Sequence, residues 1–356
     1  MLLVRFFKWQ FGPAIICLNV AFSIADRFPM LCVFIGGVGL TQVVLFFYQT
    51  VSISPKDRAV LITGCDSGFG HLLAERLHAM KFTVFACCLT SETSAVAVGL
   101  RKIGSRTSRM HVIQMDVTSQ KDVDRARKIV EDRLPKKGLW GIVNNASCYR
   151  LGFLEWLPLE TYESLSSVNV CGVMRVTKAF LPLICRSRGR IVNVSSILGR
   201  VADPFLGAYC ISKFAMKAFS DILRLEINPL KVKVSLIEPG NFMSAVNIVA
   251  GKDGSNARTR QMWNQLSDSV KQDYGEESLS RQTRLWEAFL NLAERDIGCV
   301  INAMSDALCR LFPKYRYFEA NLFDRTMACC IQFLPTFLSN HLRLFFHTQL
   351  LKYMYD

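Results

Sequence analysis

An apolar strand followed at once by a glycine-rich turn is the feature that most limits how this chain can fold. The run Ala59-Val-Leu-Ile-Thr63 is apolar and β-branched, glycines follow at positions 64, 68 and 70, and Leu72-Leu-Ala-Glu-Arg-Leu77 has helical periodicity. Glycines let the backbone approach a pyrophosphate closely, and the N–H groups at a helix N-terminus stabilise its negative charge. The segment therefore predicts a strand, turn and helix unit that can bind a dinucleotide.

Strand and helix patterns then alternate along the chain. Strands are expected at 59–63, 82–87, 111–115, 141–145, 190–195 and 233–237, and helices near 70–80, 92–102, 120–134, 160–185 and 209–228. This alternation predicts an α/β fold, a doubly wound parallel sheet of Rossmann type in a single domain. Ligands bind such sheets at the carboxyl ends of the strands.

Tyr209 and Lys213 are one helical turn apart, and Ser196 stands thirteen residues before Tyr209 at the end of a predicted strand. A tyrosine hydroxyl has an ordinary pKa of about 10, so its use as a proton shuttle requires a nearby cation that favours the phenolate. Residues i and i+4 share a helix face, so Lys213 can be that cation. A serine on a neighbouring strand end can polarise a substrate carbonyl. The three residues predict hydride-transfer chemistry.

Taken in chain order, the motifs resemble the short-chain dehydrogenase/reductase superfamily over about residues 57–245. They are Thr63-Gly-x-x-x-Gly-x-Gly70, Asp116-Val-Thr, Asn144-Asn-Ala, Asn169, Ile191-Val-Asn-Val-Ser-Ser196, Tyr209-x-x-x-Lys213 and Glu238-Pro-Gly240. The residues that occupy these motifs are most similar to those of one branch of the superfamily. That branch holds microsomal retinol dehydrogenases, 17β-hydroxysteroid dehydrogenase type 2 and mitochondrial D-β-hydroxybutyrate dehydrogenase.

The resemblance implies a role for each matching residue. Tyr209 is the proton shuttle, Lys213 lowers its pKa and holds the ribose, Ser196 binds the substrate oxygen, and Asn169 anchors a water that relays the proton. The implied cofactor-binding residues are Thr63, Gly64, Ser67, Gly68, Phe69, Gly70, Asp116, Val117, Asn145, Ala146, Lys213, Pro239, Gly240 and Ser244. Residues 241–295 are polar and poor in strand pattern, which is where this superfamily carries the loop and helices that cover the substrate.

The second predicted strand ends in Ala86-Cys-Cys-Leu-Thr90, which offers neither an acid for a ribose 2′-hydroxyl nor a cation for a 2′-phosphate. Ser67 stands where NADP-using relatives often have a cation. With the branch resemblance, this favours NAD. One residue departs from the family: Ser147 replaces the usual glycine after Asn-Asn-Ala. If the backbone at that position needs a positive φ or passes very close to the cofactor, a serine there costs about 1 kcal/mol of conformational strain. The expected consequence is an activity that is reduced or restricted to particular substrates.

The resemblance implies a membrane enzyme that interconverts a secondary alcohol and a ketone, on a steroid or sterol derivative or a retinoid. Two alternatives stay open. One is a D-3-hydroxybutyrate-type dehydrogenase, for which Arg150 is the nearest cation that could pair with a carboxylate substrate. The other is a weakly catalytic scaffold that binds NAD within a membrane biosynthetic complex, which Ser147 alone supports.

Surplus apolar sequence lies at the two ends of the chain. Residues 9–25 and 28–55 carry no charge, and the second run is long enough to span a bilayer, which needs about 20 apolar residues. A retained anchor at 1–54, with one or two spans in the endoplasmic reticulum membrane, is therefore expected, and a cleaved signal or a mitochondrial presequence is the alternative. The catalytic domain is expected at 55–320. Residues 321–356 mix large apolar residues with cations, as interfacial helices do.

Charge distribution and cysteine spacing argue against nucleic-acid binding and against a metal site. The formal net charge is +14, but lysines and arginines are scattered without a basic run, which favours an anionic membrane surface over nucleic acid as the partner. The thirteen cysteines lack metal-ligand spacing and several lie in apolar runs, so no metal site is expected. Whether the chain forms a homo-oligomer is left open.

Overall fold

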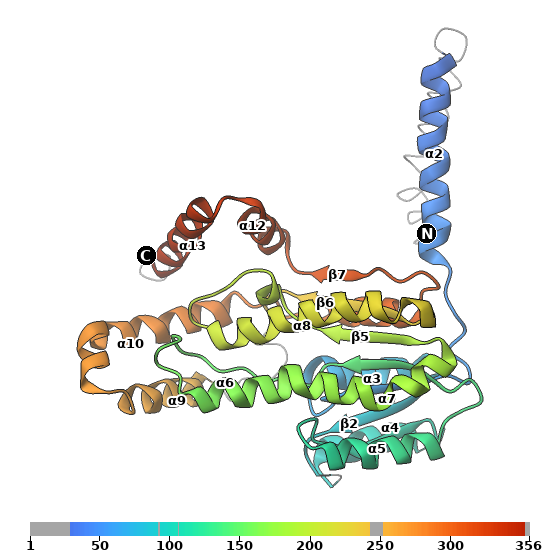
Figure 1. Cartoon of the computed structure of the whole chain (residues 1–356), viewed down its shortest axis with the longest axis horizontal. Coiled ribbons are helices and arrows are strands. Elements are labelled where there is room, and N and C mark those ends of the chain that lie inside the picture. The colour runs from blue at the N-terminus through green and yellow to red at the C-terminus, as the bar shows by residue number, and fades with distance from the viewer. Residues whose placement is uncertain (1–28, 92, 106, 243–251, 353–356) are drawn as a thin grey trace. The chain divides into compact units, whose positions relative to one another are not determined.

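The computed structural model describes residues 29–91, 93–105, 107–242 and 252–352 (Figure 1). Its centre is a seven-stranded sheet in the order β3-β2-β1-β4-β5-β6-β7, with every neighbouring pair parallel. This confirms the predicted doubly wound parallel sheet. The strands are β1 (Ala59–Thr63), β2 (Thr83–Cys88), β3 (Met110–Gln114), β4 (Leu139–Asn144), β5 (Arg190–Val194), β6 (Lys233–Pro239) and β7 (Arg316–Glu319).

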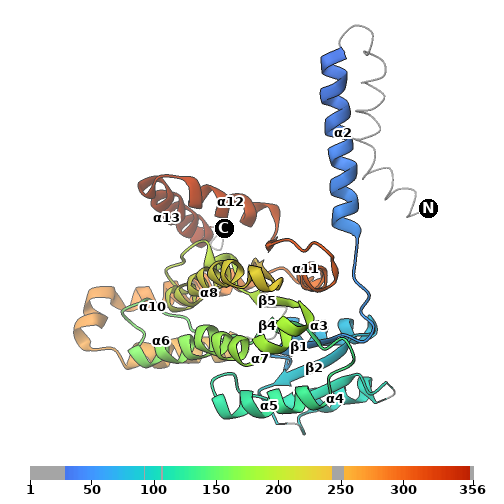
Figure 2. The same cartoon turned by 45° about the vertical axis from the view of Figure 1, so that its right-hand side comes forward.

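Helices cover both faces of the sheet (Figures 1 and 2). One face carries α5 (Gln120–Asp132), α7 (Val173–Ser187) and α8 (Gly207–Glu226), whose apolar residues join one buried cluster with Leu61, Phe85 and Ile191 of the strands. The other face carries α3 (Gly68–Ala79), α4 (Ala95–Gly104) and α11 (Gly298–Cys309). Because β1, β2, β4 and β5 are buried along their whole length, their sequences are mostly apolar.

Two elements differ from the sequence-based expectation. The helix expected at 160–185 is α6 (Leu159–Ser166) and α7, joined by a π-type turn, η1 (Ser167–Gly172). Strand β7 was not predicted. In the polar stretch after β6 lie α9 (Lys252–Asn264) and α10 (Asp268–Asn291), while residues 243–251 lie outside the described part.

Contacts divide the chain into two compact units, and the described residues up to Ser54 belong with Cys309–Pro313. In this unit, α2 (Pro29–Thr50) has 22 residues and no charged side chain. After it, the Ile53 N–H donates to the Cys309 carbonyl at 2.7 Å, and Tyr48 stacks on Phe312. The first apolar run, 9–25, lies outside the described residues.

Within the described residues, one helical stretch, Leu159–Ser187, meets the length and composition of a membrane span. Its α7 part places Val176, Phe180 and Ile184 in the buried cluster under the sheet, so it is a core helix of the catalytic unit. The apolar part of α2 that meets the same hydropathy criterion, Val33–Val44, is shorter. The anchor therefore stays a prediction.

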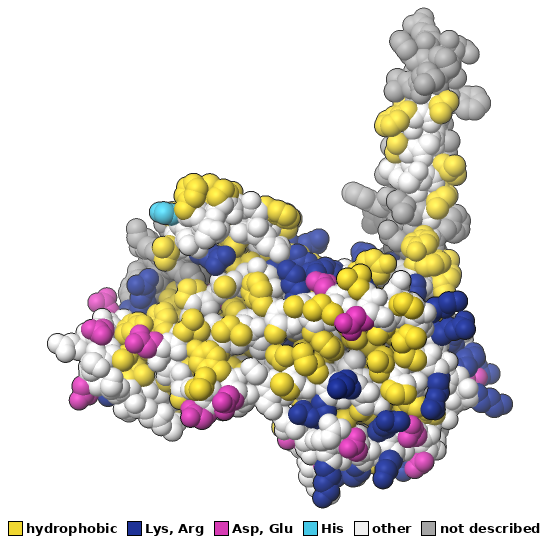
Figure 3. Space-filling model, in the orientation of Figure 1, with side chains coloured by type: hydrophobic (Ala, Val, Ile, Leu, Met, Phe, Trp, Pro, Cys, Tyr) yellow, Lys and Arg dark blue, Asp and Glu magenta, His cyan; other side chains and the backbone are white. Residues whose placement is uncertain are grey.

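The C-terminal segment forms α12 (Leu322–Phe333) and α13 (Thr336–Lys352). Large apolar side chains stay exposed on both helices, among them Leu322 at 81%, Phe333 at 86% and Leu344 at 64%. Apolar side chains are seen along the outer surface of these helices in Figure 3. The expected amphipathic character is thus present, and attachment of this segment to a membrane stays a prediction.

Candidate active site

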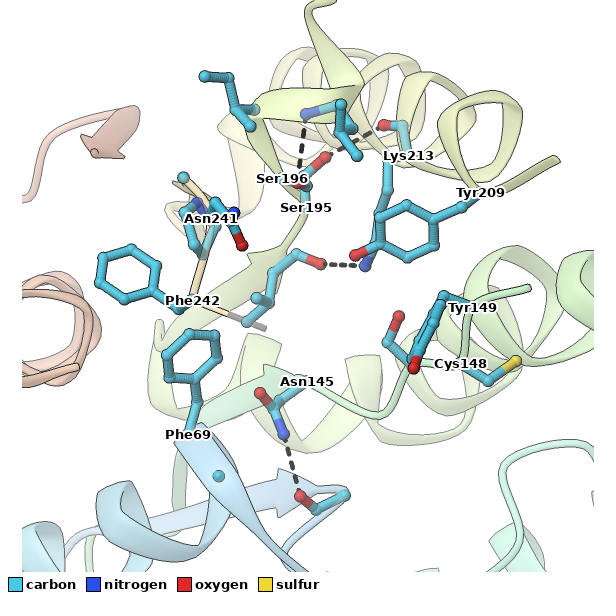
Figure 4. Close-up of a pocket in the computed structure, with 18 of the residues that line it drawn as sticks. Phe69, Asn145, Cys148, Tyr149, Ser195, Ser196, Tyr209, Lys213, Asn241 and Phe242 are labelled. Atoms are coloured by element: carbon cyan, nitrogen blue, oxygen red, sulfur yellow. Dashed lines mark hydrogen bonds between the residues drawn. The ribbon is translucent and has the colours of Figure 1, made fainter. Parts of the chain in front are cut away.

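A cavity of about 390 Å³ opens at the carboxyl ends of β1, β4, β5 and β6 (Figure 4). This volume lies in the range of small-molecule sites. Its lining includes Gly64, Asp66, Ser67, Gly68, Phe69, Asn145, Ala146, Ser147, Cys148, Tyr149, Ser196, Leu198, Leu206, Tyr209, Lys213, Phe242 and Phe289. The structure therefore brings the predicted tyrosine, lysine and serine to the same cavity as the glycine turn.

The glycine turn between β1 and α3 is packed too closely for side chains. Gly64 and Gly68 have φ values of +70° and +56°, which glycine adopts without strain. A Cβ on Gly70 would lie 2.3 Å from the Gly64 carbonyl oxygen and 2.6 Å from Asn145 Nδ2. Each of the three glycines is thus required by the local geometry.

Thr63 and Asn145 tie this turn to the end of β4. Thr63 Oγ1 accepts hydrogen bonds from the backbone N–H groups of Asn145 and Ala146, both at 3.0 Å, and Asn145 Nδ2 donates to the carbonyls of Thr63 and Gly64, also at 3.0 Å. These bonds use most of the polar atoms of both side chains. Their role is to hold the shape of the turn.

The turn fits the pyrophosphate of a dinucleotide. Helix α3 starts at Gly68, and the side chain of its N-cap, Ser67, makes no capping hydrogen bond. The first N–H groups of a helix carry partial positive charge and favour an anion when no side chain caps them. Gly64, Ser67, Gly68 and Phe69 line the cavity at this point.

Tyr209 and Lys213 lie on α8 and are both deeply placed. Lys213 Nζ donates to the Val194 carbonyl at 3.1 Å and lies 5.3 Å from the Tyr209 ring centroid. Burial lowers the pKa of Lys213 to about 8, and burial also raises the pKa of Tyr209, against the opposing effect of the Ser147 and Ser196 hydroxyls. The spacing predicts that Lys213 lowers the tyrosine pKa; in the structure the Ser147 and Ser196 hydroxyls are the groups that lower it, and burial outweighs them.

Replacing Lys213 with methionine is expected to raise the free energy of unfolding by up to about 3 kcal/mol at pH 7, because a buried ammonium is removed. The unfolded chain binds a proton more tightly than the folded chain between about pH 8 and 10.5. Parent stability therefore rises with pH across that window, and the advantage of Lys213→Met disappears there. Chemical denaturation of the parent and the variant at pH 7 and pH 10 measures the gain in the free energy of unfolding and its loss at high pH. The exposed Lys178→Met is the matched control, and equal gains from both variants would contradict the assignment.

Asn169 lies in the π-type turn η1, a distortion that is frequent at functional sites. Its Nδ2 donates to the Cys148 carbonyl at 2.8 Å and to Ser212 Oγ at 3.0 Å, and its Oδ1 accepts from the Cys148 N–H at 2.8 Å. The side chain thus fixes the loop after β4, which carries Ser147. Its implied part in proton relay stays a prediction.

Ser196 begins the short 3₁₀ turn η2 (Ile197–Gly199), where its Oγ accepts from the Leu198 N–H at 3.2 Å. The residue after this turn, Arg200, donates from Nε to the fully buried Glu238 carboxylate at 2.8 Å. Arg316 of β7 also reaches Glu238, at 3.5 Å. A buried charge that loses its partner is strongly destabilising, so this network holds the Ser196 turn against β6 and β7.

Ser147 does not occupy a left-handed backbone conformation, because every described non-glycine residue with positive φ lies elsewhere. The backbone strain that a positive φ would impose on a serine is therefore absent at this position. Its Oγ is buried and makes no hydrogen bond within the described part of the structure, and its effect on the Tyr209 pKa places it near the tyrosine hydroxyl, where it can donate to the phenolate.

Replacing Ser147 with glycine is expected to raise the Tyr209 pKa and to lower turnover at pH 7 by about 5-fold, the equivalent of one hydrogen bond of about 1 kcal/mol. The pH profile of alcohol oxidation should shift upward by about half a unit or more. Ser147→Ala removes the hydroxyl but keeps the Cβ. If the hydroxyl is the group that matters, this variant should behave like Ser147→Gly. Faster turnover in Ser147→Gly, with Ser147→Ala unchanged, would show instead that the Cβ obstructs the cofactor.

Several implied cofactor residues lie around the rim. Pro239 and Gly240 line the cavity after β6, while Asp116 and Val117 do not line it. The Asp116 carboxylate accepts from Thr118 N and Oγ1, both at 2.8 Å, which makes a local turn after β3. Ser244 lies outside the described residues. No cluster of metal-ligating side chains occurs among the residues that the structure describes.

Reasoning from motifs missed residues that the fold brings to the cavity. Phe242 packs edge-on to Phe69 at 6.0 Å, and Tyr149 stacks on Trp286, whose helix also contributes Phe289. Asp66 of the glycine turn is a further lining residue. Apart from Phe69, none of these residues has an assigned role in a sequence motif. The apolar periodicity of α10 was the one sequence signal that could have located Trp286 and Phe289.

Comparison with known proteins agrees with the geometry. The family model described as short chain dehydrogenase matches residues 58–253. A bovine (Bos taurus) mitochondrial D-beta-hydroxybutyrate dehydrogenase is 43% identical over 75% of this chain and 78% of its own length. A human (Homo sapiens) 17-beta-hydroxysteroid dehydrogenase type 6 is 37% identical over 86% of this chain and 94% of its own length. The predicted branch is thereby confirmed.

The fold also agrees with a solved structure. A short chain dehydrogenase/reductase from Burkholderia phymatum, in complex with NAD, superposes with a TM-score of 0.62 at 19% identity. The alignment covers 79% of this chain and 96% of the other. At this identity, the match supports the Rossmann-type fold.

Proposed function

The chain belongs to the short-chain dehydrogenase family, and from that premise we propose that it oxidises or reduces a lipophilic substrate, either the secondary alcohol and ketone of a steroid or sterol derivative or the primary alcohol and aldehyde of a retinoid. It is an NAD(H)-binding oxidoreductase that acts on hydroxy groups. The observation that carries the proposal is the cavity in which Tyr209, Lys213 and Ser196 lie with the glycine turn.

The character of the lining supports a lipophilic substrate. Phe69, Phe242, Phe289, Leu198 and Leu206 surround the catalytic groups. Among the described lining residues, Lys213 is the one cation, and it donates to a backbone carbonyl. A buried substrate carboxylate without a cation partner is costly, so an uncharged apolar substrate fits this lining better.

In the direction of alcohol oxidation, Ser196 donates a hydrogen bond to the substrate oxygen, and Tyr209, once it has lost its own proton, accepts the hydroxyl proton as the phenolate. A bound nicotinamide would supply the hydride acceptor. Lys213, held by the Val194 carbonyl, orients toward the tyrosine ring and supplies positive charge beside the developing phenolate. The proposed holders of the cofactor are the uncapped N-terminus of α3 and the Gly64 to Gly68 turn.

The hydroxybutyrate-type alternative draws support from the bovine relative. It requires a cation for the substrate carboxylate. Arg150 is exposed, donates to the Tyr149 carbonyl at 2.8 Å and lines a second cavity, which shares Tyr149 with the main cavity, whereas Arg150 itself does not line the main one. The described part of the main cavity therefore favours the lipophilic substrate.

A substrate panel tests the proposal. Detergent-solubilised full-length protein is incubated with NAD and with 17β- and 3α-hydroxysteroids, retinol or D-3-hydroxybutyrate, and NADH formation is followed by absorbance. Turnover of a steroid or retinol with none of hydroxybutyrate is the expected result. Turnover of hydroxybutyrate alone would replace the proposed substrate class, and NADH binding without turnover of any of these would favour the scaffold alternative.

A further inference from the structure

The end of β2 carries no acid, yet a carboxylate reaches it from another element. Asp66 of the glycine turn accepts hydrogen bonds from the Leu89 N–H at 2.8 Å, the Thr90 N–H at 2.9 Å and the Thr90 hydroxyl at 2.7 Å. The Thr90 hydroxyl also lies 3.1 Å from the Oγ of Ser94, the N-cap of α4, whose hydroxyl can donate to it. Asp66 also lines the main cavity. It thus joins the glycine turn to the loop after β2 and faces the space between them.

This space is where a dinucleotide places its adenosine ribose. In doubly wound folds the pyrophosphate lies at the first glycine turn, and the end of the second strand reads the ribose 2′ position. We propose that Asp66 is the residue that selects NAD over NADP in this chain. The proposal rests on the proposed function, since it concerns the cofactor of that same site.

Charge and hydrogen bonding both support this assignment. A 2′-phosphate carries nearly two negative charges, and like charges a few ångströms apart at a partly buried site repel strongly. The three hydrogen bonds fix the carboxylate at the strand end, so it cannot turn away from an incoming phosphate. A ribose 2′-hydroxyl, by contrast, can donate to the acceptor sites that remain on a carboxylate.

The thiol of Cys88, at the end of β2, reports the local electrostatic balance. Its pKa is raised to about 12, first by burial and next by the negative charge of Asp66, while Arg101 acts in the opposite direction with a smaller effect. At this thiol the negative charge of Asp66 therefore has a larger effect than the positive charge of Arg101. A 2′-phosphate at the strand end would be repelled by the same carboxylate.

The test measures binding directly. Dissociation constants of NADH and NADPH are obtained for the full-length protein from energy transfer between tryptophan and the reduced nicotinamide. Three variants are compared: Asp66→Asn removes the charge, Asp66→Glu retains it, and Asp124→Asn removes an exposed charge on α5 that pairs with Gln120. Thermal unfolding of each variant confirms that it is folded.

Asp66→Asn is expected to reduce the preference for NADH over NADPH by about 10-fold or more, with Asp66→Glu within about 3-fold of the parent and Asp124→Asn unchanged. An unchanged preference in Asp66→Asn would overturn the proposal. An equal loss in Asp66→Glu would overturn it as well, because the shape of the loop and not its charge would then decide. If the parent binds neither nucleotide, the proposed function itself fails, and this outcome is distinct from the other two.

Discussion

Turnover of the Tyr209→Phe variant is expected to fall by about 10² to 10⁴, the usual contribution of a positioned general acid or base. The substitution removes one hydroxyl from a partly buried side chain and leaves the ring that packs with Leu206 and Cys210. Folding and cofactor binding should therefore be retained. The measurement is the initial rate of NADH formation with the best substrate of the panel, beside a circular dichroism melt and an NADH titration.

The matched control is Tyr315→Phe, since Tyr315 is 67% exposed and lies outside the cavity. It should keep parental turnover. A Tyr209→Phe rate within a few-fold of the parent would exclude the tyrosine as proton shuttle. A lost NADH titration would point instead to a structural role in the cofactor site.

The strands that sequence patterns located share one physical property. β1, β2, β4, β5 and nearly all of β6 are buried, so each is rich in apolar and β-branched residues that sequence patterns can detect. β7 is different. It has four residues, Arg316-Tyr-Phe-Glu319, of which Tyr317 alone is buried. Its place depends on pairing with β6 and on ion pairs of Arg316 with Asp221 and Glu238, which are distant in sequence.

The same distinction divides the site. Tyr209, Lys213 and Ser196 could be found because fixed spacings on a helix and a strand end carry their geometry. Asp66 could not, because its partners Leu89 and Thr90 lie 23 and 24 residues later. The π-type turn at Asn169 was also missed, since apolar periodicity does not register one extra residue in a helical turn.

The predicted attachment of the chain to a membrane depends on α2. Its 22 residues carry no charge, and Val33, Phe34 and Leu40 are exposed by 65% or more. An exposed helix that is apolar on all sides is unfavourable in water and favourable in lipid. We propose that residues 1–54 anchor the enzyme in the endoplasmic reticulum membrane, where a lipophilic substrate can reach the cavity from the bilayer. A mitochondrial membrane is the alternative, as the name of the bovine relative indicates for that protein.

Full-length protein is expected to remain in the membrane pellet after alkaline carbonate extraction, and a chain that begins at residue 55 is expected to appear largely in the supernatant. Burying about twenty apolar residues in lipid far exceeds the contribution of peripheral electrostatics, which carbonate removes. Val38→Arg combined with Val44→Arg tests the same point without deletion, since each charge within a membrane helix costs about 3 kcal/mol. NADH binding confirms that each protein is folded. Residual pelleting of the shortened chain should disappear when 321–356 is also removed. Full-length protein in the carbonate supernatant would contradict the anchor, and N-terminal sequencing would then show whether a targeting segment had been removed, as the mitochondrial alternative requires.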